Sequence, residues 1–250
     1  MKMYPLTRAR LWLRCLLSGE KCIACGEMDT KGESLLCEKC EKELMMSHLL
    51  VCMECGSYAR DCTCPSFIMK QNGIGMLVKY AFYDASRNEA ALNRVIARLK
   101  HVPDRMTFSY LAAVLSVQIE KIRRSHDYGK DELCITHVPR SRKGIASDGH
   151  DQAKMLAAAL ARRTGLPHLT AIVRRLDGKP QKLLGFDERV DNVRGLFALK
   201  RGAKLSGRTV ILVDDVVTTG ATVSECAKLL CENGAREVIC LCIAKADKIS

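Results

Sequence analysis

From residue 76 onward, short apolar runs alternate with longer segments in which apolar residues recur every three or four positions. The apolar runs predict strands at 76–84, 132–138, 169–175, 209–213 and 237–244. The periodic segments predict helices at 86–100, 106–124, 151–165 and 222–235. Strands that alternate with helices predict an α/β fold in which helices cover both faces of a mostly parallel sheet.

The first part of the chain has a different pattern. Residues 1–21 form a short basic lead-in, residues 22–64 are rich in cysteine and poor in core-forming residues, and residues 65–75 contain a proline and two glycines. We therefore expect a lead-in at 1–21, a small domain at 22–64, a linker at 65–75 and the main α/β domain at 76–250. A domain this short usually depends on metal, disulfides or oligomerisation for its stability.

The cysteines of the small domain come in pairs, the first three of which begin at 22, 37 and 52. Without a secretory signal, such spacing indicates metal more often than disulfides. Two pairs supply the four thiolates that tetrahedral zinc prefers, so we expect one or two structural zinc ions. The ligands would be Cys22, Cys25, Cys37, Cys40, Cys52, Cys55, Cys62 and Cys64. The pairs could combine in sequence, or the first pair could combine with the third.

The stretch TVILVDDVVTTGAT at 209–222 carries two carboxylates out of a buried strand and continues with small and hydroxyl residues. In parallel sheets, ligands bind beyond the carboxyl ends of the strands, and the next helix N-terminus attracts anions. We expect this loop to hold a phosphate through Thr218, Thr219, Gly220, Ala221 and Thr222. The carboxylates of Asp214 and Asp215 suit hydroxyls of the same ligand, or a bridging Mg²⁺. A ribose 5-phosphate has both kinds of group.

Basic residues follow the strand at 132–138, at the same edge of the expected sheet. We assign Arg140, Arg142 and Lys143 to a pyrophosphate group, because arginine gives bidentate contacts to phosphate and lysine a point charge. The polar region 175–192 has the length of a functional lid. Its cations could close over the ligand: Arg175, Lys179, Lys182 and Arg189. Lys100 fits either an anion-binding role or an ordinary helix-end cation.

The charge balance narrows the partners only to anions. Lysine and arginine total 40 against 28 acidic residues, a formal net charge of +12, which suits phosphorylated metabolites, nucleic acid or acidic membranes. Aromatic residues are only 5%, so surfaces for base stacking are sparse. Arginines interrupt the N-terminal apolar segment, and no stretch approaches the ~18 apolar residues of a membrane span. We expect a cytoplasmic protein.

The stretch 209–222 resembles the phosphoribosyl-pyrophosphate (PRPP) motif of type I phosphoribosyltransferases, and two further segments resemble the ComF family. VPRSRKGIASDGHDQAKMLA at 138–157 and RRLDGKPQKLLGFDERVDNVRGLF at 174–197 are similar to that family's two signature regions. The matching positions are Val138, Pro139, Arg140, Arg142, Lys143, Gly149, Asp151, Gln152, Gln181, Leu184, Arg189, Asn192 and Phe197. The chain departs at Asp148, where many members carry arginine, and at His150, where the pattern has an aromatic residue.

The resemblance implies a phosphoribosyltransferase-like domain, with an N-terminal zinc finger, that binds PRPP with Mg²⁺. Asp214 and Asp215 would hold the ribose hydroxyls, and Thr218 to Thr222 the 5-phosphate. Val216 and Val217, which join the acids to the loop, and Gln181 of the second signature are counted with the PRPP-binding residues. The resemblance also implies a role in natural competence, with imported single-stranded DNA and other competence proteins as partners.

Two functions therefore stay open. In the first, an enzyme transfers ribose 5-phosphate to an unidentified acceptor by positioning and charge neutralisation, through Asp214, Asp215, Arg140 and Arg189. In the second, a binding module senses PRPP and handles DNA. DNA could bind at the basic cluster 140–143, where it would compete with PRPP, or at the zinc segment.

Overall fold

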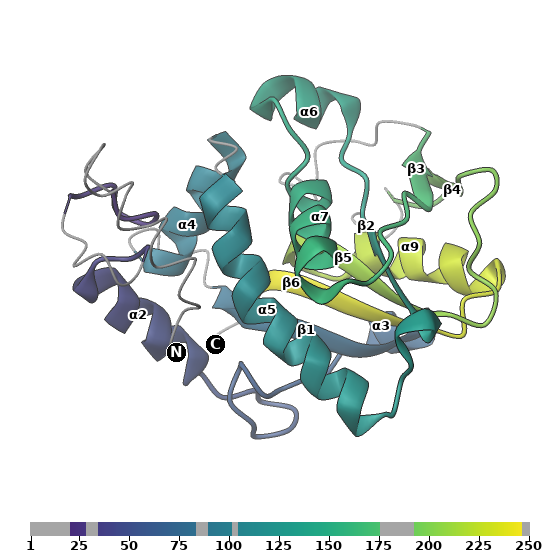
Figure 1. Cartoon of the computed structure of the whole chain (residues 1–250), viewed down its shortest axis with the longest axis horizontal. Coiled ribbons are helices and arrows are strands. Elements are labelled where there is room, and N and C mark those ends of the chain that lie inside the picture. The colour runs from purple at the N-terminus through teal and green to yellow at the C-terminus, as the bar shows by residue number, and fades with distance from the viewer. Residues whose placement is uncertain (1–20, 29–34, 84–89, 102–104, 176–192, 247–250) are drawn as a thin grey trace.

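We describe the protein from a computed structural model, which covers residues 21–28, 35–83, 90–101, 105–175 and 193–246 (Figure 1). Its centre is a four-stranded sheet of order β1-β6-β5-β2 in which every neighbouring pair is parallel. The strands are β1 (Ile74–Tyr83), β2 (Leu133–His137), β5 (Thr209–Val217) and β6 (Glu237–Ala246). This arrangement confirms the predicted α/β fold class.

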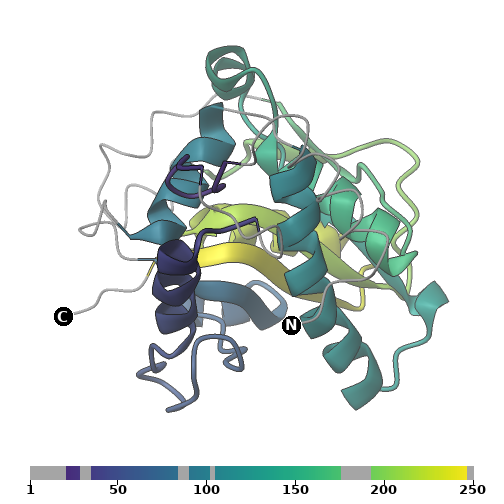
Figure 2. The same cartoon turned by 60° about the vertical axis from the view of Figure 1, so that its left-hand side comes forward.

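Helices cover both faces of the sheet (Figures 1 and 2). On one face lie α4 (Ala91–His101), α5 (Arg105–Ser125) and α7 (Gln152–Thr164), and on the other α3 (Phe67–Gln71) and α9 (Ala221–Glu232). Successive side chains of β5 point to opposite faces, so Ile211 packs with the α5–α7 layer and Leu212 with the α9 layer. Because both faces are buried, the strand is apolar without alternation.

Four short elements complete the main domain. The 3₁₀ helix η1 (Lys130–Glu132) precedes β2, and α6 (Arg142–Asp148) lies between β2 and α7. A separate antiparallel pair joins β3 (Ile172–Arg174) to β4 (Phe197–Leu199). The strand expected at 169–175 is therefore shorter than predicted, and it pairs with β4 outside the parallel sheet. Because β4 is distant in sequence, no local pattern indicated this partner.

Two other segments differ from expectation. The region expected as a linker, 65–75, forms α3 and the start of β1, and Met69 is fully buried beneath the loop that precedes α9. β5 continues four residues past the predicted end at 213, because Asp214, Val216 and Val217 still pair with β6. The two acids thus belong to the end of the strand itself, which fixes their backbone.

The cysteine-rich segment lies against one end of the main domain and contains α2 (Glu38–His48). α2 packs against α4 and β1, and Cys22, Cys37 and Cys40 join the apolar cluster of the α5–α7 face. Across the described ranges, no helix has both the length and the apolarity needed to cross a membrane.

Candidate functional site

A hollow of about 770 Å³ lies at the carboxyl edge of the sheet, where the parallel strands end. We call it the edge hollow. The end of β5, the following loop and the start of α9 form one wall, and the segment from β2 through α6 to the start of α7 forms the other. Several predicted site residues line it together: Lys100, Arg140, Lys143, Asp214, Asp215, Val216, Val217, Thr218, Thr219, Gly220, Ala221 and Thr222.

The loop before α9 requires glycine at one position. Gly220 has a φ of 85°, and a Cβ there would lie 2.8 Å from Cγ of Met69. Gly220 is also the N-cap of α9, so the cap residue has no side chain to occupy the first N–H groups of the helix. The hydroxyl of Thr219 accepts a bond from the N–H of Ala221 at 3.3 Å. The α9 N-terminus therefore faces the edge hollow as an anion-binding end.

The two carboxylates are half-buried at the end of β5. The N–H of Asp215 donates to Oδ1 of Asp214 at 2.9 Å, and the N–H of Val216 donates to Oδ1 of Asp215 at 2.7 Å. Burial, followed by the neighbouring charge of Asp215, raises the pKa of Asp214 well above its usual value. No lysine or arginine of the described residues forms an ion pair with either acid. Two neighbouring carboxylates without a protein cation beside them fit a Mg²⁺ ion. Mg²⁺ binds one or two protein carboxylates and fills its other coordination positions with substrate oxygens and water.

Arg140, which precedes α6, contacts residues at the end of α6 and at the start of α7. Its guanidinium donates to the carboxylate of Asp148 and to Oε1 of Gln152, and its backbone N–H donates to Oδ2 of Asp151 at 3.2 Å. Asp151 in turn caps α7 by accepting from the N–H of Lys154 at 2.9 Å. The arginine assigned to pyrophosphate is thus held at the wall of the edge hollow by an internal carboxylate.

The predicted residues do not all reach the edge hollow. Arg142 lines an adjoining hollow of about 720 Å³, the side hollow, which shares Pro139, Arg140, Asp151 and Arg174 with the edge hollow. Arg175 also lines the side hollow. Four predicted residues lie outside the described residues: Lys179, Gln181, Lys182 and Arg189.

Arg174 and His137 are among the residues of these hollows that sequence reasoning missed. Arg174 lines both, and its guanidinium lies 5.4 Å from the ring centre of Phe197. The sequence signal that could have indicated Arg174 was its position near the end of the strand predicted at 169–175. His137 lines the side hollow, with Nδ1 3.3 Å from Nε2 of His168. Burial lowers the pKa of His137 to about 4, so its imidazole is neutral at physiological pH.

The cysteines form two separate clusters, each with thiols within 4.8 Å of one another. One contains Cys22, Cys25, Cys37 and Cys40, and the other Cys52, Cys55, Cys62 and Cys64, so the pairs combine in sequence and not crossed. Sγ of Cys25 lies 3.7 Å from Sγ of Cys37. Thiolates bound to one zinc at 2.3 Å in a tetrahedron are about 3.8 Å apart, so each cluster could hold a zinc ion.

Local hydrogen bonds favour the thiolate at one cysteine of each cluster, whereas burial raises the pKa of Cys25, Cys40, Cys52 and Cys64. Burial raises the pKa of Cys22, but backbone N–H groups of Cys25, Cys37 and Ala24 outweigh it and bring the pKa to about 7. Hydrogen bonds from the hydroxyl and backbone of Ser57 lower the pKa of Cys55 to about 6. Zinc binds the deprotonated form, so these groups are suited to metal at neutral pH.

Side chains of the main domain reach into both clusters. From α4, Arg94 donates to Sγ of Cys40 at 3.2 Å, and Arg98 to the carbonyl of Cys22 at 3.2 Å. From β1, Lys79 donates to the carbonyl of Cys62 at 2.8 Å and is itself 1% exposed. The clusters are thus tied to the sheet and to the helix that carries Lys100.

Comparison with known proteins finds a matching domain family and full-length relatives. The phosphoribosyl transferase domain family matches residues 144–250. Competence protein F of Haemophilus influenzae is 28% identical over 90% of this chain and 97% of its own length. Competence protein ComFC of Streptococcus pneumoniae is 23% identical over 89% of this chain and 88% of its own. These relatives and the matching domain support the resemblance to the ComF family.

Another relative is the DNA utilization protein YhgH of Escherichia coli, which is 29% identical over 83% of this chain and 96% of its own. Among solved structures, a hypoxanthine phosphoribosyltransferase from Staphylococcus aureus superposes with a TM-score of 0.36 at 13% identity. That superposition covers 56% of this chain and 64% of the other and is too loose to support an argument.

The two departures from the ComF pattern lie together. Asp148, which replaces the arginine of many members, is the residue that pairs with Arg140. His150, which replaces the aromatic residue, links two elements: its Nδ1 lies 2.7 Å from the carbonyl of Asp148 and its Nε2 2.7 Å from that of Leu99. In this chain, the end of α4 and the end of α6 are therefore joined beside the edge hollow.

Proposed function

We propose that the edge hollow binds PRPP with Mg²⁺. The observation that carries the proposal is the juxtaposition of Asp214 and Asp215 with the glycine-capped N-terminus of α9. Carboxylates at a strand end suit ribose hydroxyls, and the adjacent helix end suits the 5-phosphate. One phosphorylated sugar spans both.

The remaining cations of the edge hollow would hold the pyrophosphate. Arg140 and Lys143 lie on the wall opposite α9, and Lys100 approaches from α4. Mg²⁺, when bound, would neutralise pyrophosphate and hydroxyl oxygens, and the acids would hold it from the protein side. The protein's part is positioning and charge complementarity.

We further propose that PRPP binding supports natural competence and the handling of imported single-stranded DNA. Two relatives across nearly their full lengths are named competence proteins, and a third is named a DNA utilization protein. The net charge of +12 suits a nucleic acid partner. Other competence proteins are further candidate partners.

A second candidate function is catalysis. The side hollow opens beside the proposed ribose position and holds a neutral histidine, His137, together with Ile172 and Met155. The lining also carries Arg142, Lys154 and Arg175, so an acceptor that combines an apolar body with an anionic group would fit it. Its nucleophile would form a bond to C1 of the ribose as the bond to pyrophosphate breaks, with the pyrophosphate leaving towards Arg140 and Lys143.

The test of PRPP binding is calorimetry on the double variant Asp214→Asn, Asp215→Asn with Mg²⁺ present. Losing two charge-assisted contacts should weaken PRPP binding at least about 100-fold. The exposed Asp131→Asn is the matched control and should bind as the wild type does. Equal affinity in the double variant and the wild type would rule out the ribose assignment.

The test of catalysis is release of pyrophosphate from PRPP in the presence of nucleobases, amines and other candidate acceptors. An enzyme should release pyrophosphate only with its acceptor, and the double variant should not. If PRPP binds tightly and no acceptor drives release, the binding function stands alone.

A further inference from the structure

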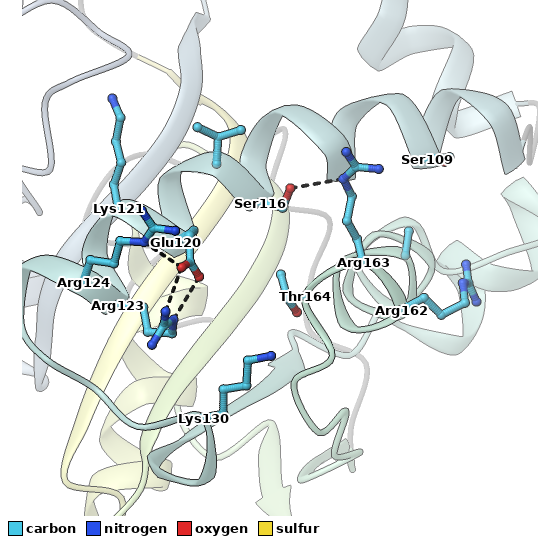
Figure 3. Close-up of a pocket in the computed structure, with 12 residues that line it drawn as sticks. Ser109, Ser116, Glu120, Lys121, Arg123, Arg124, Lys130, Arg162, Arg163 and Thr164 are labelled. Carbon is cyan, nitrogen blue, oxygen red and sulfur yellow. Dashed lines mark hydrogen bonds and ion pairs between the residues drawn. The ribbon is translucent and has the colours of Figure 1, made fainter. Parts of the chain in front are cut away.

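A second positively charged concavity lies away from the edge hollow, between α5 and α7 (Figure 3). We call it the basic groove. It has a volume of about 960 Å³ and is lined by six cations and a single carboxylate, that of Glu120. The cations are Lys121, Arg123, Arg124, Lys130, Arg162 and Arg163. The basic groove and the edge hollow share no lining residue.

The cations of the basic groove lie at the opposite edge of the sheet. Lys130 belongs to η1, directly before the start of β2, whereas the edge hollow begins where β2 ends. Arg123 and Arg124 lie in the last turn of α5, and Arg162 and Arg163 in the last turn of α7. A cation at a helix C-terminus is ordinary. Two helix ends and a 3₁₀ helix that direct their cations at one hollow need another explanation.

Glu120 holds Arg123 and Arg124 in place, and its single negative charge offsets only one of the six positive charges that line the basic groove. Its carboxylate accepts from Nε and Nη2 of Arg123 at 2.9 and 2.7 Å and from Nε of Arg124 at 2.9 Å (Figure 3). The two guanidiniums lower the pKa of Glu120 to about 2, so the pairing persists at physiological pH. Each guanidinium keeps further N–H donors beyond those given to Glu120.

Two of the remaining cations are not neutralised within the described part of the chain, whereas Lys121 forms an ion pair with Asp61 at 3.8 Å. Lys130 and Arg162 are exposed, and neither forms an ion pair with a described acidic residue. Arg163 donates to the hydroxyl of Ser116 at 3.3 Å, which directs it across the groove from α7 towards α5. The basic groove therefore presents an excess of positive charge from three elements to one concave surface.

We propose that the basic groove binds the sugar-phosphate backbone of a single nucleic-acid strand. From Ser109 to Arg124 the lining of α5 extends about 22 Å at 1.5 Å per residue, enough for several nucleotides. The axes of packed helices lie about 8–10 Å apart, so the surface groove above their contact is narrow. A single chain can follow such a groove, while a rigid duplex or a flat bilayer would touch only its rim. The lining contains no aromatic side chain, so contacts fall on phosphates and carry no base preference.

This inference deepens the DNA part of the proposed function and is independent of PRPP. It separates the two ligands: the strand binds at the amino edge of the sheet and PRPP at the carboxyl edge. The expectation that DNA and PRPP compete at the cluster 140–143 is replaced by one of independent binding.

The test uses the full-length protein and a fluorescent oligo-dT of 20 nucleotides. The variant Arg124→Gln, Lys130→Gln, Arg162→Gln removes three exposed cations of the basic groove. The matched control Arg201→Gln, Lys204→Gln, Lys228→Gln removes three exposed cations elsewhere and changes the net charge equally. Anisotropy gives affinity across a salt series, and calorimetry gives PRPP affinity.

The groove variant should lose at least tenfold in oligonucleotide affinity. Its slope of log K against log salt should become shallower by about 2, at about 0.7 per phosphate on a single strand. PRPP affinity should be unchanged, and saturating PRPP should not displace the oligonucleotide from the wild type.

Several results would overturn the proposal. An equal loss in the matched control would show that only net charge matters, and displacement by PRPP would return DNA to the edge hollow. Tighter binding of duplex, or of anionic vesicles through the same three residues, would reject the single strand. Absence of oligonucleotide binding with intact PRPP binding would reject this inference and leave the PRPP proposal standing.

Discussion

At the scale of single residues, the pairing of Arg140 with Asp148 sets how readily the edge hollow can take pyrophosphate. A phosphate oxygen must compete with an internal carboxylate for the same guanidinium. We predict that Asp148→Asn, which keeps the shape and removes the charge, tightens PRPP binding about three- to tenfold, equivalent to about 1 kcal/mol. Calorimetry with Mg²⁺ measures it, and Asp131→Asn again serves as the control. Weaker binding would show instead that Asp148 positions Arg140 for the ligand.

Asp214 supplies a second residue-scale prediction, on stability. Burial and Asp215 raise its pKa in the folded protein above the value of the unfolded chain. Below the unfolded pKa both states are protonated and the cost is absent. As the pH rises towards the folded pKa, the unfolded chain ionises more readily and folding loses stability.

The variant Asp214→Asn should therefore melt at a higher temperature than the wild type at pH 7 without ligand, and the gap should shrink towards pH 4. Thermal melts across this pH range measure the effect. A variant that is less stable at pH 7 would mean that the carboxylate stabilises the folded state. A gain in stability with loss of PRPP binding would mark Asp214 as a residue retained for function.

At the scale of elements, the loop between β5 and α9 depends on the contact between Gly220 and α3. We predict that Gly220→Ala destabilises the protein by about 1–2 kcal/mol through its left-handed backbone, and by more because the new Cβ would meet Met69. Gly207→Ala is the matched control: its φ is 70°, and a Cβ there meets nothing within 4 Å. Denaturant unfolding of both variants isolates the Met69 contribution. Equal losses would show that α3 does not constrain the loop.

The sequence predicted the long elements and missed the short ones for physical reasons. β5 and α9 were predictable because a strand buried on both faces is apolar throughout, and because Asn233 and Gly234 end the helix. α3 has five residues, too few to show a helical period, and its place depends on Gly220 far along the chain. β3 pairs with β4 across a long sequence separation, which no local pattern reports.

The candidate site was predictable only where its residues lie close together in the sequence. The acids and the phosphate loop follow one strand directly, so their proximity is local. The division of Arg140 and Arg142 between two hollows depends on how α6 turns after Ser141, whose hydroxyl caps the helix by accepting from the N–H of Gly144. The pairing of cysteines in sequence likewise depends on packing, because both groupings satisfy the spacing.

At the scale of the whole molecule, the buried Lys79 ties the second cysteine cluster to β1, an edge strand of the sheet. Its ammonium donates to the carbonyl of Cys62 and lies 4.9 Å from the ring centre of Phe82. A buried cation without a partner costs several kcal/mol. If zinc holds Cys62 in place, metal loss should therefore weaken the main domain and not only residues 22–64.

We predict that the purified protein contains tightly bound zinc, and that chelation exposes residues 22–64 to proteolysis. The main domain should stay folded but melt at a lower temperature. In Lys79→Met the apolar stem remains and the charge is gone, so the metal-bound variant should lose about 1–3 kcal/mol, the cost of leaving the Cys62 carbonyl unpaired. Because no buried charge is then stranded, its melting temperature should fall less on chelation than that of the wild type.

The exposed Lys70→Met is the control and should behave as the wild type. Elemental analysis and melts with and without chelator complete the cycle, and equal falls in Lys79→Met and wild type would show that the zinc segment and the sheet are energetically independent.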